Sequence, residues 1–186
     1  YGFIGNRMLR PYGATVQLLL LEGASPHQID AAMESWGMAM GPLRVFDLAG
    51  LDIDYKARRA LSDEERGDPK TYRVPDLLVE LGRMGQKSGS GFYAYDDKRR
   101  PQPDAAVDKL IELVAEDFGI ERRKVTGDEI VDRLISALVD EGQKILDEGI
   151  AQRSSDIDVV YVYGYGFPVS RGGPMFYAQN QPTDTA

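Results

Sequence analysis

Cysteine is missing from the 186 residues of the sequence, so a disulfide framework, a thiolate metal site and a thiol nucleophile are all excluded. No apolar run reaches the roughly 20 residues that a membrane helix needs, and we expect no membrane span. Histidine is nearly absent: His27 is the sole copy, and it follows Ser25–Pro26 at the expected start of a helix. We interpret His27 as a solvated surface residue, and no cluster of histidine and carboxylates suggests a metal site.

Positive charge is also scarce. The chain carries 22 Lys and Arg residues against 30 Asp and Glu residues, which gives a net charge of −8, and no basic cluster is present. This balance argues against nucleic acid or an anionic membrane as partner, although a few local Lys or Arg residues can still bind an anionic ligand. The proportions of 42% hydrophobic and 28% charged residues are those of an ordinary globular protein of one or two domains.

The chain is organised around the stretch that opens it, Gly2–Pro11, from which a helical pattern continues to Glu22. Apolar residues recur every three or four positions and predict one buried face: Ile4, Met8, Tyr12, Val16 and Leu19. The opposite face is small and polar: Asn6, Arg10, Gly13 and Gln17. Pro11 and Gly13 are unfavourable inside a helix, by about 3 and about 1 kcal/mol. They predict a bent helix that another backbone or a ligand approaches closely; the alternative is a bent core helix with an exposed amide.

Further helices are predicted from capping residues and from hydrophobic periodicity. Ser25 is an N-cap that forms a capping box with Gln28, and Thr126 forms another with Glu129. The expected helices span 25–36, 42–49, 51–61, 75–81, 106–118 and a long segment from 126 onward. We expect a charged loop at 62–72 and a polar, proline-containing linker at 96–103.

The segment Gly82–Gly91 is rich in glycine and contains Lys87 and Ser88, as a phosphate-binding loop would. A P-loop needs a glycine immediately before the lysine, however, and Gln86 occupies that position. The segment also follows a predicted helix rather than a strand, and it lacks the dinucleotide-binding spacing. We therefore interpret it as a turn that leads into a short extended piece, Phe92–Tyr95.

An internal repeat relates the two ends of the chain. Three residues recur with the same type 126 positions later. Arg7 recurs as Arg133 (133 − 7 = 126), Gly23 as Gly149, and Pro42 as Pro168. The repeated unit is a long helix, a Glu-Gly pair, a short helix that begins with Ser, and a glycine-proline break. No strand-rich segment appears, so we predict an all-α fold of two related helical halves.

The two halves have diverged within the long helix of the repeated unit, where Pro11 corresponds to Ala137. Asn6 corresponds to Asp132 in the second half, whereas Arg7 keeps its counterpart, Arg133. We therefore predict a special role for Asn6. For Arg7 we predict a structural ion pair, because the half that lacks the asparagine retains the arginine.

Three motifs occur in the order Gly2–Tyr12, Met40–Asp52 and Gly82–Tyr95, and they read GFIGNRMLRPY, MGPLRVFDLAGLD and GRMGQKSGSGFYAY. They resemble the C-terminal domain of 3-hydroxyacyl-CoA dehydrogenases, which follows the NAD-binding domain of those enzymes. The likeness resumes in a second copy near the C-terminus and covers most of residues 1–178. It implies an all-α fold of the 6-phosphogluconate dehydrogenase C-terminal-domain-like type, without the NAD-binding Rossmann domain.

Tandem copies of this domain are typical of the multifunctional fatty-acid oxidation enzymes, which also carry an enoyl-CoA hydratase domain. The monofunctional dehydrogenase has a single copy and dimerises through it. The resemblance therefore implies a first C-terminal domain at 1–95, a linker with an amphipathic helix at 96–125, a second, diverged copy at 126–178 and a disordered tail at 179–186. Because the chain begins directly on a motif, we expect it to be a piece of a longer protein. Its end lacks a peroxisomal Ser-Lys-Leu signal, which favours a bacterial cytoplasmic source.

By this resemblance, the parent enzyme oxidises a 3-hydroxyacyl-CoA to the 3-ketoacyl-CoA of fatty-acid β-oxidation, with NAD as cofactor. The family's catalytic histidine and glutamate and its NAD site lie in the NAD-binding domain, so this chain is expected to supply no cofactor-binding residue and to be inactive alone. Asn6 matches the asparagine that hydrogen-bonds the substrate near the reacting carbon. Met40, Gly41 and Pro42 are expected to shape the acyl pocket or, equally, to pack in the core.

A second function is kept open, that of a non-catalytic helical module for subunit association, which includes formation of a homodimer. If the chain is part of the dehydrogenase, its partners are an acyl-CoA substrate and the NAD-binding domain. In that case we expect an exposed apolar patch at the surface where the NAD-binding domain packs.

Overall fold

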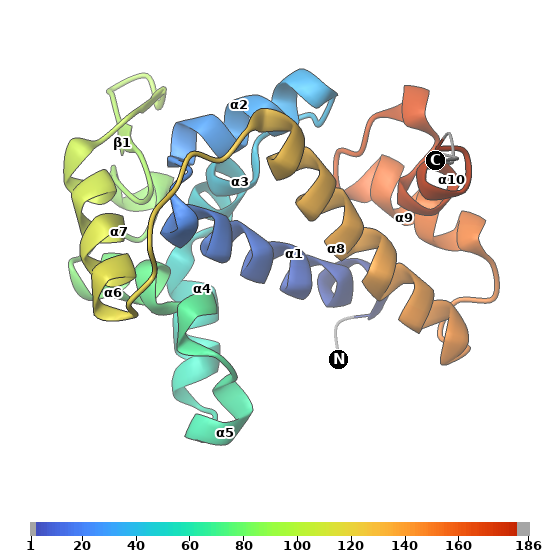
Figure 1. The fold of residues 1–186 in the computed structure, drawn as a ribbon, viewed down its shortest axis with the longest axis horizontal. Coiled ribbons are helices and arrows are strands. Elements are labelled where there is room, and N and C mark those ends of the chain that lie inside the picture. The colour runs from blue at the N-terminus through green and yellow to red at the C-terminus, as the bar shows by residue number, and fades with distance from the viewer. Residues whose placement is uncertain (1–2, 182–186) are drawn as a thin grey trace.

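The computed structural model describes residues 3–181, and helices dominate this range (Figure 1). The helices are α1 (Phe3–Glu22), α2 (Pro26–Trp36), α3 (Pro42–Ala49), α4 (Leu51–Arg59), α5 (Asp63–Arg66), α6 (Arg73–Glu80), α7 (Ala105–Asp117), α8 (Gly127–Asp147), α9 (Ser154–Gly164) and α10 (Pro174–Gln179). Short 3-10 turns are η1 (Pro69–Thr71), η2 (Gln86–Ser88) and η3 (Val169–Arg171). Two short strands, β1 (Ala94–Tyr95) and β2 (Pro101–Gln102), pair in antiparallel fashion. The prediction of an all-α fold is confirmed.

The two longest helices, α1 and α8, pack against each other at the centre of the molecule (Figure 1). Helices α2 to α7 lie toward one end of this pair, and α9 and α10 lie toward the other end. The predicted apolar face of α1 is buried at Met8, Tyr12, Val16 and Leu19, whose side chains are at most 4% exposed, and Ile4 at its start is half-buried. The predicted polar face is wrong at one position, because Gln17 is 3% exposed and lies in the core.

A glycine in the middle of α8 lets three helices meet. A Cβ atom at Gly142 would overlap the sulfur of Met175 in α10 and press on the methyl group of Met8 in α1. Glycine costs about 1 kcal/mol in a helix relative to alanine. At this position the close approach of the two methionines requires it.

Two reciprocal ion pairs join the ends of α1 and α8. Near the start of α1, Arg7 donates to Glu148, just past the end of α8, through Nη1 (2.5 Å) and Nη2 (2.8 Å). Near the start of α8, Arg133 donates to Glu22, at the end of α1, through Nη1 (2.6 Å) and Nη2 (2.8 Å). The start of each helix thus meets the end of the other, so the two helices are antiparallel. The predicted structural ion pair of Arg7 is confirmed.

A buried aspartate in each half caps the short helix that follows it. Asp30 of α2 accepts hydrogen bonds from the backbone N–H groups of Leu43 (2.8 Å) and Arg44 (3.1 Å) at the start of α3. Asp158 of α9 accepts from Met175 (2.8 Å) and Phe176 (3.1 Å) at the start of α10. A carboxylate is stabilised at a helix N-terminus by the unpaired N–H groups and by the helix dipole.

The glycine before each capped helix is required by this contact. A Cβ atom at Gly41 would overlap Asp30, and a Cβ atom at Gly173 would overlap Asp158 in the same way. The proline that begins α10 is Pro174, which therefore plays the part that Pro42 plays at the start of α3. A constant offset of 126 pairs Pro42 with Pro168 instead, and this pairing is wrong because the turn that contains η3 lengthens the second half.

The glycine-rich segment wraps around a carboxylate of the protein itself. Asp47, at the buried end of α3, accepts from the backbone N–H groups of Phe92 (2.9 Å) and Tyr93 (3.0 Å). A Cβ atom at Gly85 or at Gly91 would overlap Asp47. The interpretation of this segment as a turn is confirmed, and Gly85 and Gly91 make room for Asp47.

Each of the two predicted capping boxes makes only one of its two hydrogen bonds. Ser25 accepts from the backbone N–H of Gln28 (3.2 Å), but the Gln28 side chain donates to the carbonyl oxygen of Val125 (2.6 Å) instead of returning to the cap. Thr126 likewise accepts from the N–H of Glu129 (3.2 Å), while the Glu129 carboxylate pairs with arginines. A long-range partner outweighs the local return bond in both places.

Three predicted irregular stretches differ from expectation. The charged stretch 62–72 contains the short helix α5 and the turn η1, because Ser62 and Glu65 form a complete capping box. The predicted linker 96–103 closes the β1–β2 hairpin, in which Asp96 accepts from the N–H groups of Lys98 and Arg100 (2.9 Å each). In the predicted tail, Gln179 still belongs to α10, and residues 182–186 lie outside the described residues.

The Arg133–Glu22 pair should make stability depend on pH. The hydrogen bond from Arg133 lowers the pKa of Glu22 below its ordinary value of 4.5, so the stabilisation is present above that pH and is lost as the pH falls through the lowered pKa. Between pH 6 and pH 3, wild type should lose about 0.5–1 kcal/mol more unfolding free energy than Glu22→Gln, as for pairs that solvent can reach. Urea unfolding at both pH values measures this difference.

The matched control for that experiment is Glu64→Gln, because Glu64 is exposed and makes no ion pair among the described residues. It should keep the pH dependence of the wild type. Equal pH dependence in wild type and Glu22→Gln would show that the ion pair adds nothing to stability.

Candidate functional site around Asn6

Asn6 lies in the first turn of α1, and its side chain is exposed. Its carbonyl oxygen, Oδ1, accepts a hydrogen bond of 2.9 Å from the hydroxyl group of Tyr165. Tyr165 follows the last residue of α9, in the second half of the chain. The predicted site residue of the first half therefore contacts a residue 159 positions away.

The Tyr165 ring is held by its surroundings. It stacks on the ring of Tyr161 with a centroid separation of 4.9 Å and an interplanar angle of 22°. The hydroxyl group of Tyr161 is buried and donates to the carbonyl oxygen of Gly5 (3.2 Å). Burial raises the pKa of Tyr161, which keeps the phenol protonated as a donor. A Cβ atom at Gly5 would overlap the far end of the Tyr165 ring, so a larger residue there would displace the ring.

The arrangement can present hydrogen-bond donors without a charge. Asn6 offers an amide nitrogen with two N–H groups, and within residues 3–181 this nitrogen has no hydrogen-bond partner. The neighbouring cation is not available to a ligand, because Arg7 is paired with Glu148 and with Glu141 (2.7 Å). The hydrogen bonds that Arg7 donates to these two carboxylates raise the pKa of Arg7, and the bond to Glu148 contributes most.

The other predicted site residues lie at the start of α3. Gly41 is buried against Asp30, Pro42 is buried at the first position of α3, and Met40 is half-buried. Burial raises the pKa of Asp30 to about 6, although the hydrogen bonds that Asp30 accepts from Tyr93 and from the backbone lower that pKa. This geometry explains Gly41 and Pro42 by packing, and their contribution to an acyl pocket stays a prediction.

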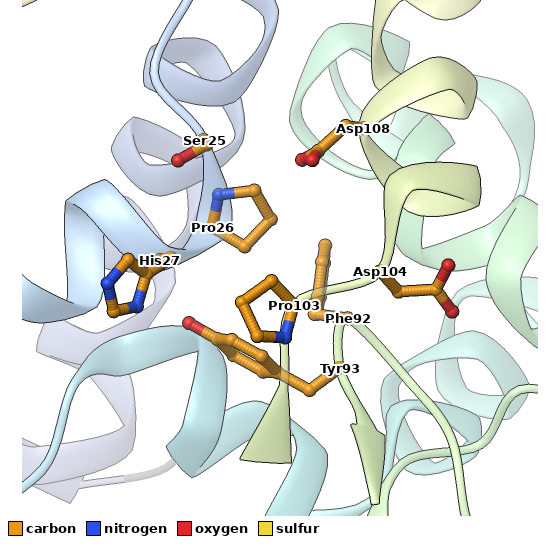
Figure 2. A pocket seen from close by; sticks show the side chains of 8 residues that line it. All are labelled: Ser25, Pro26, His27, Phe92, Tyr93, Pro103, Asp104 and Asp108. Atoms are coloured by element: carbon orange, nitrogen blue, oxygen red, sulfur yellow. The ribbon is translucent and has the colours of Figure 1, made fainter.

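A separate cavity of about 210 Å³ opens between the starts of α2 and α7 (Figure 2). Apolar rings and four polar side chains line it, and these residues are Ser25, Pro26, His27, Phe92, Tyr93, Pro103, Asp104 and Asp108. Burial and the nearby charges of Glu112 and Asp104 raise the pKa of Asp108. The carboxylates disfavour an anionic ligand at this cavity. It also lies beyond the far end of α1, which is about 24 Å from Asn6 at 1.5 Å per helical residue.

Three further observations bear on His27, on metal binding and on membrane-spanning helices. His27 is exposed at the start of α2, as the sequence analysis predicts. In residues 3–181, no group of three or more His, Asp and Glu side chains is placed to hold a metal ion. No helix of that range is long and apolar enough to cross a membrane.

Sequence reasoning missed Tyr165. The signals available were the tyrosines at 161, 163 and 165, which alternate with Val162, Gly164 and Gly166, and the glycine at position 5 inside a predicted helix. Neither feature alone indicates a contact between the two halves. Only the fold brings α9 to the start of α1.

The fold places the chain in the class of helical domains that accompany dehydrogenases. A solved structure of the dehydrogenase part of multifunctional enzyme 1 from C. elegans superposes with a TM-score of 0.70 at 30% sequence identity. The match covers 90% of this chain and 37% of that one.

The chain belongs to the family of the 3-hydroxyacyl-CoA dehydrogenase C-terminal domain, which residues 2–95 match. It is 45% identical over 190 residues to the peroxisomal bifunctional enzyme of Danio rerio, a match that covers 95% of this chain and 26% of the relative. It is 34% identical over 178 residues to the fatty acid oxidation complex subunit alpha of Pseudomonas putida strain GB-1. This match covers 95% of this chain and 25% of the relative. The chain thus spans about a quarter of the length of these curated relatives. They include a peroxisomal and a bacterial enzyme, so a bacterial cytoplasmic source stays a prediction.

Replacing Asn6 should leave the fold intact. Asn6→Ala removes one exposed hydrogen bond and adds a better helix former, so the free energy of unfolding should fall by no more than about 1 kcal/mol. Arg7→Ala should cost more, because it leaves Glu141 half-buried without its main partner. Urea unfolding of both variants measures the two changes. A loss from Asn6→Ala as large as that from Arg7→Ala would mean that Asn6 is mainly structural.

Proposed function

We propose that this chain is the substrate-binding, C-terminal part of an NAD-dependent 3-hydroxyacyl-CoA dehydrogenase of fatty-acid β-oxidation. The observation that carries the proposal is Asn6, an uncharged and exposed amide in the first motif of the family, fixed at Oδ1 by Tyr165. Membership of the family and the names of the similar enzymes support the same reaction. The substrate would be a 3-hydroxyacyl-CoA and the product the 3-ketoacyl-CoA.

We also infer that the chain arose by internal duplication, as in the multifunctional type of these enzymes. The support is the repetition of specific contacts. Arg7–Glu148 repeats as Arg133–Glu22, and the aspartate that caps α3 has a counterpart that caps α10. The division into 1–95, 96–125 and 126–178 follows this duplication, with the α7 segment between the copies.

The role of Asn6 would be to donate a hydrogen bond to an oxygen of the substrate near the reacting carbon. An amide provides this contact without the cost of desolvating a charge, and a fixed donor stabilises charge that develops on oxygen in the transition state. Arg7 would act only through the fold, since its charge is taken up by two carboxylates.

The segment of this chain that most resembles a phosphate-binding loop does not suit the pyrophosphate of NAD. The carboxylate of Asp47 packs against Gly91 and accepts from the two N–H groups that directly follow the segment, those of Phe92 and Tyr93. A carboxylate there repels a pyrophosphate, so no step of hydride transfer is assigned to this chain. We propose that a separate NAD-binding domain supplies both the cofactor site and the catalytic base.

That domain would pack near Asn6. Phe3 precedes Asn6 by three residues, on the same face of α1, and its side chain is 89% exposed. An aromatic side chain so open to water is suited to an interface. We infer that the chain alone has no dehydrogenase activity, because the base and the cofactor would arrive with the partner domain.

The alternative function, a helical assembly module without a role in catalysis, is favoured by a different surface. Val45 and Leu48 of α3 are 37% and 59% exposed, one turn apart on a helix. A second copy of the chain could cover them and form a homodimer. This function needs no contribution from Asn6.

The test is acetoacetyl-CoA reduction by NADH in the full-length enzyme that contains these residues, with Asn6→Ala beside wild type. We expect kcat/KM to fall about a hundredfold, which corresponds to about 2.7 kcal/mol of transition-state stabilisation. Steady-state kinetics over a range of both substrates measure the change.

The control variant is Gln143→Ala, an exposed residue of α8, which should keep the wild-type rate. Wild-type kinetics for Asn6→Ala would remove the residue from the reaction. The assembly function would then be the better account of this part of the enzyme.

A further inference from the structure

We propose that Tyr165 is a positioning residue that sets which way the Asn6 amide faces. This inference rests on the proposed function, because it concerns the orientation of Asn6 in the same substrate site. Its structural basis is the hydrogen bond from the Tyr165 hydroxyl group to Asn6 Oδ1 (2.9 Å). The second half of the chain would then supply a working part of the substrate site in the first half.

An asparagine side chain has no orientation of its own. Its terminal torsion is broad and two-fold, so a half-turn exchanges the carbonyl oxygen with the amide nitrogen at little cost. An exposed asparagine can therefore meet a substrate either as donor or as acceptor. A neighbour that recognises one end of the amide removes this ambiguity.

Tyr165 favours one end of the amide. Its hydroxyl group can donate or accept, but a phenol is a better donor than acceptor, so the carbonyl oxygen Oδ1 is its preferred partner, as in the structure. When its O–H group donates to Oδ1, the nitrogen Nδ2 and its two N–H groups are directed to the remaining open side. Asn6 then faces the substrate as a donor, which suits a carbonyl oxygen or the oxygen that becomes one during oxidation. It does not suit recognition of a hydroxyl proton.

The tyrosine can perform this task because it is fixed itself. Its ring stacks on Tyr161 at 4.9 Å, and Tyr161 is anchored by its hydrogen bond to the carbonyl oxygen of Gly5. Both tyrosines thus hold adjacent residues of α1, Gly5 and Asn6. The tyrosine pair orders the amide without help from the ligand.

Gly5 is the third component of the arrangement. A Cβ atom there would overlap the far end of the Tyr165 side chain, which would have to leave Asn6. The helix has glycine at this position although alanine would stabilise the helix by about 1 kcal/mol. Gly13, in the same helix, has no such constraint, because a Cβ atom there would make ordinary contact with Phe46 at 3.5 Å.

The experiment is a double-mutant cycle in the full-length enzyme, with Tyr165→Phe, Asn6→Ala and the double variant. Phenylalanine keeps the stacked ring and removes only the hydroxyl group. We expect Tyr165→Phe to lower kcat about tenfold with little change in KM, because the amide must then be ordered during the reaction. In the Asn6→Ala background the same change should have no further effect, since the residue on which it acts is gone.

Two matched controls separate positioning from structure. Tyr163→Phe changes a tyrosine in the last turn of α9, two residues before Tyr165, that is 85% exposed, and it should keep the wild-type kcat. Gly5→Ala should lower kcat as Tyr165→Phe does, by displacing the ring, whereas Gly13→Ala should not. Urea unfolding of each variant shows that the fold is retained.

The outcomes distinguish this inference from the proposed function. If Asn6→Ala has wild-type kinetics, both fail. If Asn6→Ala loses activity while Tyr165→Phe keeps the wild-type kcat, the positioning role alone is overturned. Independent, multiplicative losses from the two single changes would also overturn it, because Tyr165 would then act without Asn6. A loss confined to KM would show that Tyr165 supports binding uniformly and does not orient the amide.

Discussion

The antiparallel packing of α1 on α8 is the contact on which the remaining arrangement depends. The helices are joined at both ends by Arg7–Glu148 and Arg133–Glu22, and Gly142 lets α10 approach the same seam. Each ion pair is of modest strength where solvent reaches it, so the buried apolar faces supply most of the stability. The ion pairs instead fix the direction and register of the two helices. With this register α9 reaches the start of α1, and Tyr165 meets Asn6.

Buried carboxylates determine how the short helices attach to this pair. Asp30, Asp47 and Asp158 are nearly excluded from water, and each accepts backbone N–H bonds from a later segment of the chain. Burying a charge without partners would be costly, and these hydrogen bonds offset that cost. The glycines that face the carboxylates follow from the same contacts. A segment rich in glycine can therefore serve an internal carboxylate as readily as an external phosphate.

Much of this could be predicted from the sequence, because local signals determined it. The apolar period of α1, the cap at Ser25 and the repeat that pairs Arg7 with Arg133 each depend on residues within a few turns or on direct self-comparison. What failed depended on distant partners. Gln28 leaves its capping box for Val125, and the turn that contains η3 shifts the repeat. Tyr165 could not be found because no local pattern records which helix end it will face.

An uncharged site residue places a particular demand on its fold. A charged group attracts a ligand from any orientation, but an amide must face the correct way to be useful. In this chain the orientation comes from outside the helix that carries Asn6, from a tyrosine whose ring is stacked and whose neighbour is anchored to Gly5. In the function that we propose, the two halves therefore share one site although they are unequal in sequence. The half with Asp132 at the position that corresponds to Asn6 would then contribute to the site by supplying the group that orders the other half.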